Sequence, residues 1–295
     1  MNDDYKKIKN LIEMHLTTFF KNGNNNHEKR FNEIVNYSLL AGGKRLRPVL
    51  LYKTTELLKG NLEYALDLAC ALEMIHTYSL VHDDLPAMDD DDYRRGNLTS
   101  HKVYGDAMAI LAGDALLNRA YQIIISTILD SDGDKGVIKA SELIAKSAGF
   151  KGMIIGQVVD IDTENKDISN DVLNYIIENK TGKLLIAAIV SAGYLSDLSE
   201  SEIELLNKAA YHIGYSFQLI DDYLDVAGDY DHIGKSIGKD NKLGKNTYVK
   251  YNGIERTKSD AQNHLNIAKD TLKMIKGYNL DFLFDIIEYL KNREK

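Results

Sequence analysis

The sequence has little of three residue types that shape folds. Among its 295 residues there is one cysteine, there are two prolines and there is no tryptophan. Because one cysteine cannot close an internal disulfide, a disulfide-stabilised fold is excluded and a reducing compartment is indicated. Cys70 lies in an apolar run from Leu68 to Leu72, which predicts a small buried side chain. With prolines only at Pro48 and Pro86, long uninterrupted helices are possible almost everywhere.

The chain also lacks an excess of positive charge and a long apolar run. Its formal net charge is −8, which argues against a general nucleic-acid binder. The first residues, Met1 to Lys7, are acidic at once and contain no apolar signal segment. The longest apolar stretch, Leu184 to Leu195, has twelve residues and is too short to span a bilayer. We therefore expect a soluble, cytoplasmic protein that binds neither nucleic acid nor membranes.

What the sequence does have is helical periodicity. Hydrophobic residues make up 44% of the chain, and many recur at helical spacing, as do Ala65, Leu68, Leu72 and Ile75. We find no set of alternating strands, no fixed repeat and no Pro/Ser-rich linker. The pattern predicts an all-α bundle of long helices that forms one domain over residues 1–295. The expected helix breaks are Asn22 to Asn26, Leu85 to Asp92, Asp130 to Gly136, Asp162 to Asp171 and Gly228 to Asn246.

The most distinctive segment is an acidic cluster between His82 and Asp92, in which six aspartates fall within ten residues. Two unit charges ~4 Å apart repel by ~1 kcal/mol in water and by ~4 kcal/mol at an effective dielectric near 20, so the ordinary interpretation is an exposed acidic loop. Two facts weaken that interpretation. The cluster directly follows the apolar helix predicted for Leu68–Val81, and the cations Arg94 and Arg95 follow it closely.

A second acidic cluster lies in the segment Phe217–Asp225. At 100° per residue, Asp221 and Asp225 stand about 40° apart on one helix face, with Asp222 at its edge. The rest of this helix is largely apolar, and carboxylates on a buried helix need a partner because an unpaired buried charge is costly. Two such clusters indicate divalent cations between them. Hard oxygen ligands favour Mg²⁺, which also binds substrate phosphates.

Basic residues next to glycines supply the complementary charge. In Gly42–Pro48, Lys44 and Arg47 are three residues apart, and arginine presents a planar fork that matches phosphate oxygens. Alone, this segment is more typical of a solvated turn, and His76 is more typical of a core residue. Together with other basic segments, these residues could hold two diphosphates, one through metal ions and one through side chains alone. Those other segments are Arg94-Arg95, Lys180-Thr181-Gly182, Gly234-Lys235 and Gly244-Lys245.

These segments resemble the trans-isoprenyl diphosphate synthase family, most closely its bacterial short-chain branch, which includes farnesyl diphosphate synthases. The resemblance implies an all-α fold around a central active-site cavity and a homodimer. One departure is Leu98-Thr99, where the family usually has a Pro-Thr pair, and it concerns only the local loop. The matching segments run in the family's order across most of the chain: Gly42–Pro48, Ile75–Asp84, Met88–Gly96, Ala107–Asp114, Lys180–Gly182, Phe217–Asp225 and Leu243–Lys245.

The resemblance also implies roles for individual residues. The ligands of about three Mg²⁺ ions, which bind together with the allylic diphosphate, would be Asp83, Asp89 and Asp221. Their supporting carboxylates would be Asp84, Asp222 and Asp225. The positions that hold isopentenyl diphosphate are matched by Gly43, Lys44, Arg47, His76 and Arg95. The positions around the allylic diphosphate are matched by Arg94, Lys180, Thr181, Gln218, Lys235 and Lys245, and the first five of these form the expected catalytic set.

The implied reaction condenses isopentenyl diphosphate with dimethylallyl or geranyl diphosphate to give farnesyl diphosphate. Ionisation of the allylic C–O bond leaves negative charge on the diphosphate, which Mg²⁺, lysine and arginine stabilise. No protein nucleophile is needed, and the released diphosphate is the expected base. Tyr78 lies five residues before Asp83, roughly 7.5 Å along a helix, and a ring there would limit the product to about fifteen carbons. Because Tyr78 is about 140° from Asp83 around the helix, Ser79 is the alternative pocket floor.

Several alternatives have sequence support of their own. A geranylgeranyl diphosphate synthase of the same family would differ only in product length, whereas a non-catalytic regulatory subunit would lack an acidic cluster. A terpene cyclase would not need Gly42–Pro48. A di-iron bundle is suggested by Glu73-x-x-His76 but needs two such motifs, and a phosphate-binding loop at Gly228 to Ser236 has the wrong spacing. Lys291 and Arg293 could close over the site, but a solvated tail is expected.

Overall fold

Local capping signals decide where many of the helices begin. The side chain of Asn61 accepts hydrogen bonds from the backbone N–H groups of Glu63 and Tyr64, at 3.0 and 3.2 Å. In the same way Asn25 caps α2, Asp134 caps α7 and Ser169 caps α9. Each of these side chains satisfies N–H groups that have no partner inside the helix, and this stabilises the first turn.

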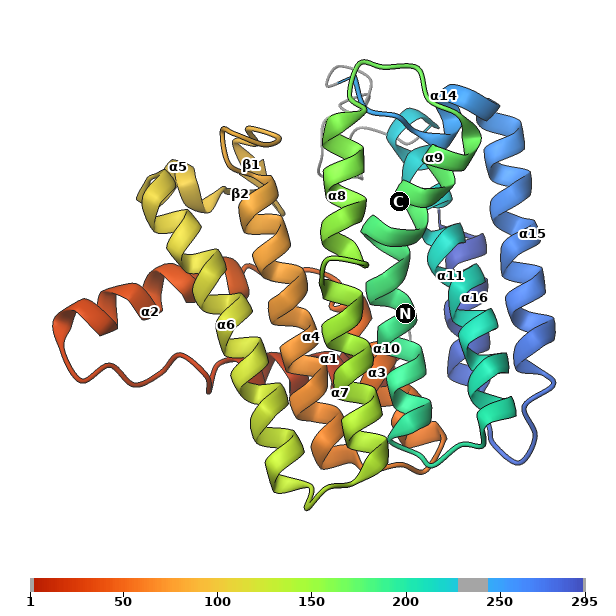
Figure 1. Ribbon diagram of the computed structural model, residues 1–295, viewed down its shortest axis with the longest axis horizontal. Helices are drawn as coiled ribbons and strands as arrows, with labels where there is room; N and C mark the ends of the chain where they lie inside the picture. The colour runs from red at the N-terminus through yellow and green to blue at the C-terminus, as the bar shows by residue number, and fades with distance from the viewer. Residues whose placement is uncertain (1–2, 228–243, 294–295) are drawn as a thin grey trace.

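The computed structural model describes residues 3–227 and 244–293, and these residues form almost only helices (Figure 1). The prediction of an all-α fold is confirmed. The helices are α1 (Asp3–Leu16), α2 (Asn26–Leu39), α3 (Leu46–Leu57), α4 (Leu62–Asp83), α5 (Ser100–Tyr104), α6 (Asp106–Asp130), α7 (Lys135–Ala148), α8 (Met153–Asp162), α9 (Asn170–Ile176), α10 (Lys183–Tyr194), α11 (Glu200–Ala227), α14 (Tyr248–Asn252), α15 (Ile254–Leu272) and α16 (Asp281–Lys291).

Two short features were not predicted. β1 (Tyr93–Arg94) and β2 (Asn97–Leu98) form a small antiparallel hairpin around Arg95 and Gly96, which have φ values of 54° and 81°. Positive φ at both central residues is what a two-residue hairpin turn requires. Between α9 and α10, residues Ile177–Gly182 form a π-helical turn, η1, at a place where the sequence analysis expected no helix break.

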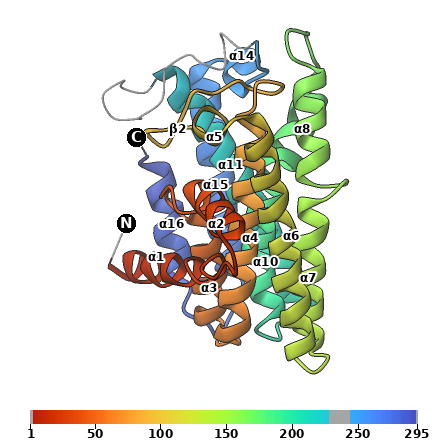
Figure 2. The ribbon, with the colours of Figure 1, turned by 90° about the vertical axis from the view of Figure 1, so that its left-hand side faces the viewer.

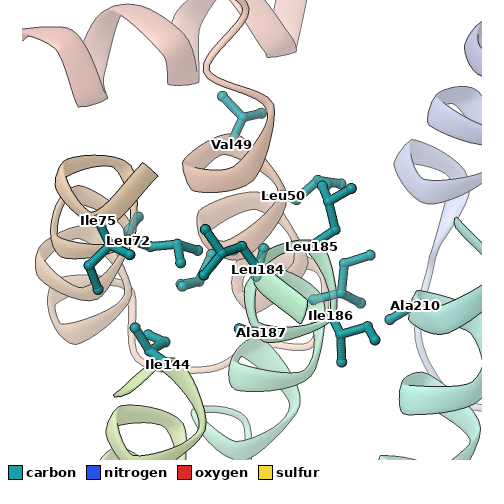
Figure 3. Packing of buried hydrophobic residues seen from close by; sticks show 14 of the residues in the cluster. Val49, Leu50, Leu72, Ile75, Ile144, Leu184, Leu185, Ile186, Ala187 and Ala210 are labelled. Atoms are coloured by element: carbon teal, nitrogen blue, oxygen red, sulfur yellow. The ribbon is translucent and has the colours of Figure 1, made fainter. Parts of the chain in front are cut away.

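The core is centred on α10 and α4. Every residue of α10 from Leu184 to Gly193 is buried, and Cys70 on α4 is fully buried, as predicted. Figure 3 shows the side chains of α10 surrounded by Leu50 of α3, Leu72 of α4, Ile144 of α7 and Ala210 of α11. Since α4 and α10 contact apolar surfaces on several sides, their positions are fixed by packing, and so are the polar residues at their ends.

One helix among the described residues is long and apolar enough to cross a membrane, judged by length and composition alone. This helix is α6, which has 25 residues. It packs along α4, with Gly113 so close to His82 that a Cβ on the glycine would lie 2.2 Å from the imidazole. The sequence analysis counted uninterrupted apolar residues, and α6 was not noted there because polar residues interrupt its apolar ones.

The C-terminal ends of α4 and α11 lie at the same end of the bundle, the upper end in Figures 1 and 2. Both acidic clusters lie at this end, because α4 ends at Asp83 and α11 contains Asp221 to Asp225 in its last turns. The fold therefore brings together two segments that are more than a hundred residues apart in the sequence.

Candidate active site

The first acidic cluster folds back on the end of α4. The backbone N–H of Asp89 donates to the carbonyl of Asp83 at 2.9 Å, and that of Asp91 donates to the carbonyl of Asp84 at 3.1 Å. These bonds place Asp89 beside Asp83, and both residues are among the three predicted metal ligands. Asp84 and Asp91 are buried, so the interpretation of the whole cluster as a solvated loop is wrong, although Asp90 is exposed.

Cations offset the charge of this cluster. Arg94 donates from Nε to Asp84 Oδ1 at 2.6 Å, and Lys245 donates from Nζ to Asp89 Oδ2 at 2.8 Å. Burial raises the pKa of Asp83 to about 6; Lys180 acts in the opposite direction, and Asp89 raises the pKa further. The carboxyl group of Asp83 is therefore largely removed from water and depends on nearby positive charge for its ionised form.

The π-helical turn η1 brings Lys180 and Thr181 to the site. Nζ of Lys180 donates to Oδ2 of Asp160 at 2.5 Å, and Asp160 is buried on α8. Burial alone would lower the pKa of Lys180, but Asp160 and Asp83 more than offset this, so the pKa is raised and the side chain stays an ammonium. Gly156 of α8 allows this approach, because a Cβ there would lie 2.2 Å from the backbone nitrogen of Lys180.

The sequence analysis missed Asp160 and Gln157. Both amide atoms of Gln157 are buried, and neither makes a hydrogen bond within the described protein. Gln157 and Asp160 are three residues apart on α8, so they share the helix face that also carries Gly156. The signal was present in the sequence as a glutamine and an aspartate one turn apart, directly after a glycine, in an otherwise apolar helix.

The second acidic cluster is joined to Thr181 by a chain of hydrogen bonds. Thr181 Oγ1 donates to Gln218 Oε1 at 2.5 Å, and Gln218 Nε2 donates to Asp222 Oδ1 at 2.7 Å. The other oxygen of Asp222 accepts from the backbone N–H of Tyr248 at 2.6 Å. Asp222 is buried, and both of its oxygens are bonded, so it fixes the end of α11 relative to η1 and α14.

Asp221 precedes Asp222 on α11, and its carboxylate meets the C-terminal segment. Nη1 of Arg293 lies 2.7 Å from Oδ1 of Asp221, and its guanidinium lies over the ring of Phe217 at 5.4 Å. The expectation of a solvated tail is wrong for Arg293, because a carboxylate and an aromatic face together fix this guanidinium. Lys291 instead donates to Asn266 at 2.7 Å, on the neighbouring α15.

The residues expected to hold isopentenyl diphosphate gather around the start of α3. Nη1 of Arg47 lies 3.3 Å from Nε2 of His76, and Arg95 donates to the carbonyl of Gly42. Burial lowers the pKa of His76 well below its ordinary value, and Arg47 and Arg95 lower it further. His76 is therefore neutral and accepts a hydrogen bond from Arg47. The structure brings these groups together as the sequence analysis expected.

Glycine at position 43 is required by this arrangement. Gly43 has a φ of 112°, and a Cβ there would lie 2.5 Å from the guanidinium carbon of Arg95. A side chain would therefore both strain the backbone and displace the arginine. The neighbouring side chain of Lys44 is exposed, at the rim of this group.

Tyr78 and Ser79 are placed differently on α4. Tyr78 is buried, and its ring packs edge-to-face on His82 with centroids 5.8 Å apart. Ser79 is half-buried, and its hydroxyl donates back to the carbonyl of His76 at 2.9 Å. Tyr78 is thus the bulkier apolar group on the segment below Asp83. Lys235, the remaining predicted site residue, lies outside the residues that the structure describes.

The carboxylates fit a hard divalent cation. Within residues 3–227 and 244–293, no three His, Cys, Asp or Glu side chains lie close enough to form a ready-made metal cage. Mg²⁺ does not need one, because it is commonly held by one or two carboxylates together with water and substrate phosphates. Asp83 and Asp89 on one side and Asp221 on the other provide carboxylates of that kind.

Comparison with known proteins shows which family and fold the chain is similar to. Residues 28–277 match the model of the family described as polyprenyl synthetase. The chain is 45% identical over 268 residues to a farnesyl diphosphate synthase of Micrococcus luteus, covering 91% of both sequences. It is 42% identical over 260 residues to a geranylgeranyl diphosphate synthase of Cyanophora paradoxa, covering 88% and 86%. Its fold is similar to that of a geranyltransferase from Helicobacter pylori complexed with magnesium and isoprenyl diphosphate, with a TM-score of 0.82, 27% identity and coverage of 99% and 97%.

Proposed function

The chain belongs to the polyprenyl synthetase family, and we propose that its site condenses isopentenyl diphosphate with dimethylallyl or geranyl diphosphate to form farnesyl diphosphate and diphosphate. The expected enzyme type, a short-chain trans-prenyltransferase of the farnesyl diphosphate synthase kind, is confirmed by the family match and by the relative from Micrococcus luteus.

The observation that carries the proposal is the presence of two separate cation groups beside the acidic clusters. Lys180 and Lys245 adjoin Asp83 and Asp89, so a diphosphate there can be bound through metal ions as well as ammonium groups. Arg47 and Arg95 form the other group with neutral His76. A head-to-tail condensation needs two diphosphates of this kind, one that leaves and one that stays on the product.

We propose that Asp83, Asp89 and Asp221 hold about three Mg²⁺ ions together with the allylic diphosphate. The magnesium and isoprenyl diphosphate bound to the Helicobacter pylori geranyltransferase support this assignment. When bound, Mg²⁺ supplies positive charge to the leaving diphosphate. Asp84 and Asp222 would orient the ligands rather than bind the metal, because both are buried: Asp84 pairs with Arg94, and both oxygens of Asp222 accept hydrogen bonds.

The residues of the chain would act by charge and by position. Lys180 and Lys245 stabilise the negative charge that develops on the allylic diphosphate, and the hydroxyl of Thr181 is aligned by Gln218. Arg47 and Arg95 hold isopentenyl diphosphate so that its double bond faces the allylic carbon. The proton lost at the end passes to the released diphosphate, so no side chain is needed as a nucleophile. Buried apolar residues of α4 exclude water from the cation.

We propose that the protein is a cytoplasmic, single-domain homodimer. Apolar side chains are exposed along one side of the molecule, where α6, α7 and α8 lie next to one another (Figure 2). They recur at helical spacing on α8, with Phe150 just before it, and on α6: Ile154, Val158 and Ile161, and Ile110, Leu111, Ile125 and Leu129. A contiguous face of this kind favours a second copy over solvent. A monomer in light scattering at micromolar concentration would contradict the dimer.

The test of the proposed function is chromatography of the products formed from dimethylallyl and isopentenyl diphosphates with Mg²⁺. Farnesyl diphosphate as the main product, lost on chelation of the metal and restored by Mg²⁺, supports the proposal. Geranylgeranyl diphosphate would favour the second candidate, which the 42% identity to a geranylgeranyl diphosphate synthase keeps open. A hydrocarbon released without isopentenyl diphosphate would indicate a cyclase, and no turnover by the purified chain would indicate a regulatory subunit.

Product length gives a further prediction. Replacing Tyr78 with alanine removes the buried ring below Asp83, so the product should lengthen from fifteen to twenty or more carbons, by about one isoprene unit or more. Ser79→Ala serves as the matched control, since it removes only a hydroxyl that bonds to the carbonyl of His76. If Tyr78→Ala leaves the product unchanged, Tyr78 does not form the floor of the pocket.

A further inference from the structure

Glu73 and His76 lie one turn apart on α4, and each binds one arginine at the start of α3: Arg45 is its N-cap and Arg47 lies in its first turn. His76 meets Arg47, as described above, whereas Nη1 of Arg45 donates to Oε1 of Glu73 at 2.7 Å. The Glu-x-x-His motif, which first suggested a di-iron site, therefore has another use here. It attaches two points of the same short segment to one face of α4.

The Arg45–Glu73 pair is fully enclosed. The side chains of Arg45 and Glu73 are 0% and 1% exposed. Nη2 of Arg45 also donates to the carbonyl of Leu39, the last residue of α2, at 2.6 Å, and its Nε lies 3.5 Å from the carboxylate of Glu13 on α1. One guanidinium thus connects α1, α2 and α4. A buried ion pair with this many partners fixes geometry, because a shift of any partner leaves charge unpaired away from water.

The backbone at this place needs such a constraint. Gly42, Gly43 and Arg45 all have positive φ, of 81°, 112° and 54°. The left-handed conformation is unfavourable for a residue with a Cβ, so Arg45 keeps it only because its surroundings impose it. The carbonyl of the intervening Lys44 also accepts a hydrogen bond from the buried hydroxyl of Tyr5, at 2.6 Å. The loop is therefore fixed to the core at two neighbouring residues, through the side chain of Arg45 and the carbonyl of Lys44.

We propose that Glu73, acting through Arg45, is a positioning residue for isopentenyl diphosphate. The inference rests on the proposed function, which assigns Gly43, Lys44 and Arg47 to that diphosphate. Arg45 lies between these residues, but its side chain points into the core and does not reach the site. Holding Arg45 in the left-handed conformation directs Arg47 toward His76 and leaves Lys44 at the rim.

Glu73→Gln tests the proposal, because it keeps the shape of the side chain and removes its charge. We expect KM for isopentenyl diphosphate to rise about tenfold, while KM for geranyl diphosphate and kcat change by less than about twofold. Glu13→Gln is the matched control: it removes a carboxylate that faces the same guanidinium at 3.5 Å, and it should leave both KM values within about twofold. Equal changes in both KM values for Glu73→Gln would overturn the proposal.

A double variant separates positioning from stability. Arg45→Met combined with Glu73→Leu removes both charges, so it should recover much of the melting temperature that Glu73→Gln loses. Under the proposal, KM for isopentenyl diphosphate stays raised in the double variant, because the ion pair no longer holds residue 45 in its strained conformation. Recovery of KM together with the melting temperature would mean that the pair is only structural.

Limited trypsin digestion probes the conformation of the loop independently of catalytic turnover. The peptide bond after exposed Lys44 is protected as long as Arg45 stays buried, so cleavage there should be about tenfold faster in Glu73→Gln than in the parent or in Glu13→Gln. Equal cleavage rates would overturn the positioning role even if the parent protein failed to turn over the two diphosphates. Loss of turnover in the parent with the cleavage difference intact would count against the proposed function alone.

Discussion

The two acidic clusters differ in the groups that stabilise their carboxylates. At the end of α4, the carboxylates are opposed by full positive charges, as in the pairs Arg94–Asp84 and Lys245–Asp89. On α11, Asp221 also pairs with a cation, Arg293, but both oxygens of the buried Asp222 accept from neutral donors, the amide of Gln218 and the backbone N–H of Tyr248. The first cluster belongs to a loop that folds back on a helix end, whereas the second belongs to a continuous helix.

The difference bears on how each cluster can respond to a ligand. A lysine or arginine that pairs with a carboxylate can exchange it for a phosphate, since both anions bind these cations well. A buried carboxylate held by an amide and a backbone N–H has no such alternative, and breaking those bonds costs ~1.5–3 kcal/mol each. We therefore expect the first cluster to rearrange when substrate binds, whereas Asp222 in the second cluster keeps its position.

The largest effect should come from the first cluster. Asp83→Ala removes a proposed metal ligand and should lower kcat by about 10³-fold or more, because charge on the leaving diphosphate would no longer be stabilised there. Asp90→Ala removes an exposed carboxylate of the same loop and should change kcat by less than about threefold. Steady-state turnover with labelled isopentenyl diphosphate measures both, and near-normal turnover of Asp83→Ala would contradict its assigned role.

A smaller effect should follow from breaking the hydrogen-bond chain to the second cluster. Gln218→Met removes the hydrogen bond that Thr181 donates and one of those that Asp222 accepts, so we expect kcat to fall about 10- to 100-fold and the free energy of unfolding to fall by about 1–3 kcal/mol. Gln122→Met, on the exposed face of α6, controls for the substitution itself. Unaltered kcat and stability would show that neutral donors do not fix this cluster. Denaturant titration and kinetics measure the two quantities.

The smallest expected effect concerns the pH dependence of the free energy of unfolding. It comes from a histidine on α11 that lies away from both clusters. Nδ1 of His212 lies 3.0 Å from Nδ1 of His264 on α15. Burial lowers the pKa of His212 from 6.5 to about 4, and His264 contributes to this shift. Between pH 6.5 and 4, His212 binds a proton in the unfolded chain but not in the folded chain. The contribution of neutral His212 to the free energy of unfolding is therefore complete above pH 6.5 and is lost as the pH falls through this window.

The shift alone would correspond to roughly 3 kcal/mol, and screening of this partly exposed side chain reduces the expected loss to about 1–2 kcal/mol. His212→Gln should flatten the decline of the free energy of unfolding between pH 6.5 and 4. His27→Gln, on the exposed surface of α2, should leave the decline unchanged. Denaturant titrations across this range measure the slopes, and equal slopes for His212→Gln and the parent would show that this pair does not contribute.

Much of the fold could be predicted because its signals are local. The apolar spacing in α4 and the cluster of aspartates after it are contiguous in the sequence, and so are the glycines beside Lys44 and Arg47. The partners of these residues were harder to predict. Arg293 meets Asp221 across 72 positions and Lys180 meets Asp160 across 20, and such pairs follow from the packing of α11, α16, α8 and η1. No local pattern specifies them.

The widened turn η1 has a consequence for how this site tolerates changes in chain length. A π-helical turn holds one residue more than an α-helical turn, so deleting any single residue between Ile177 and Gly182 would allow an ordinary helix from α9 into α10. Helices α9 and α10 could keep their relative orientation, because the widened turn holds its extra residue without rotating them. The change would fall on the turn itself, where Lys180 would no longer be directed toward Asp160. At this place the number of residues matters more than their identity, and a one-residue gap here should be more damaging than most substitutions.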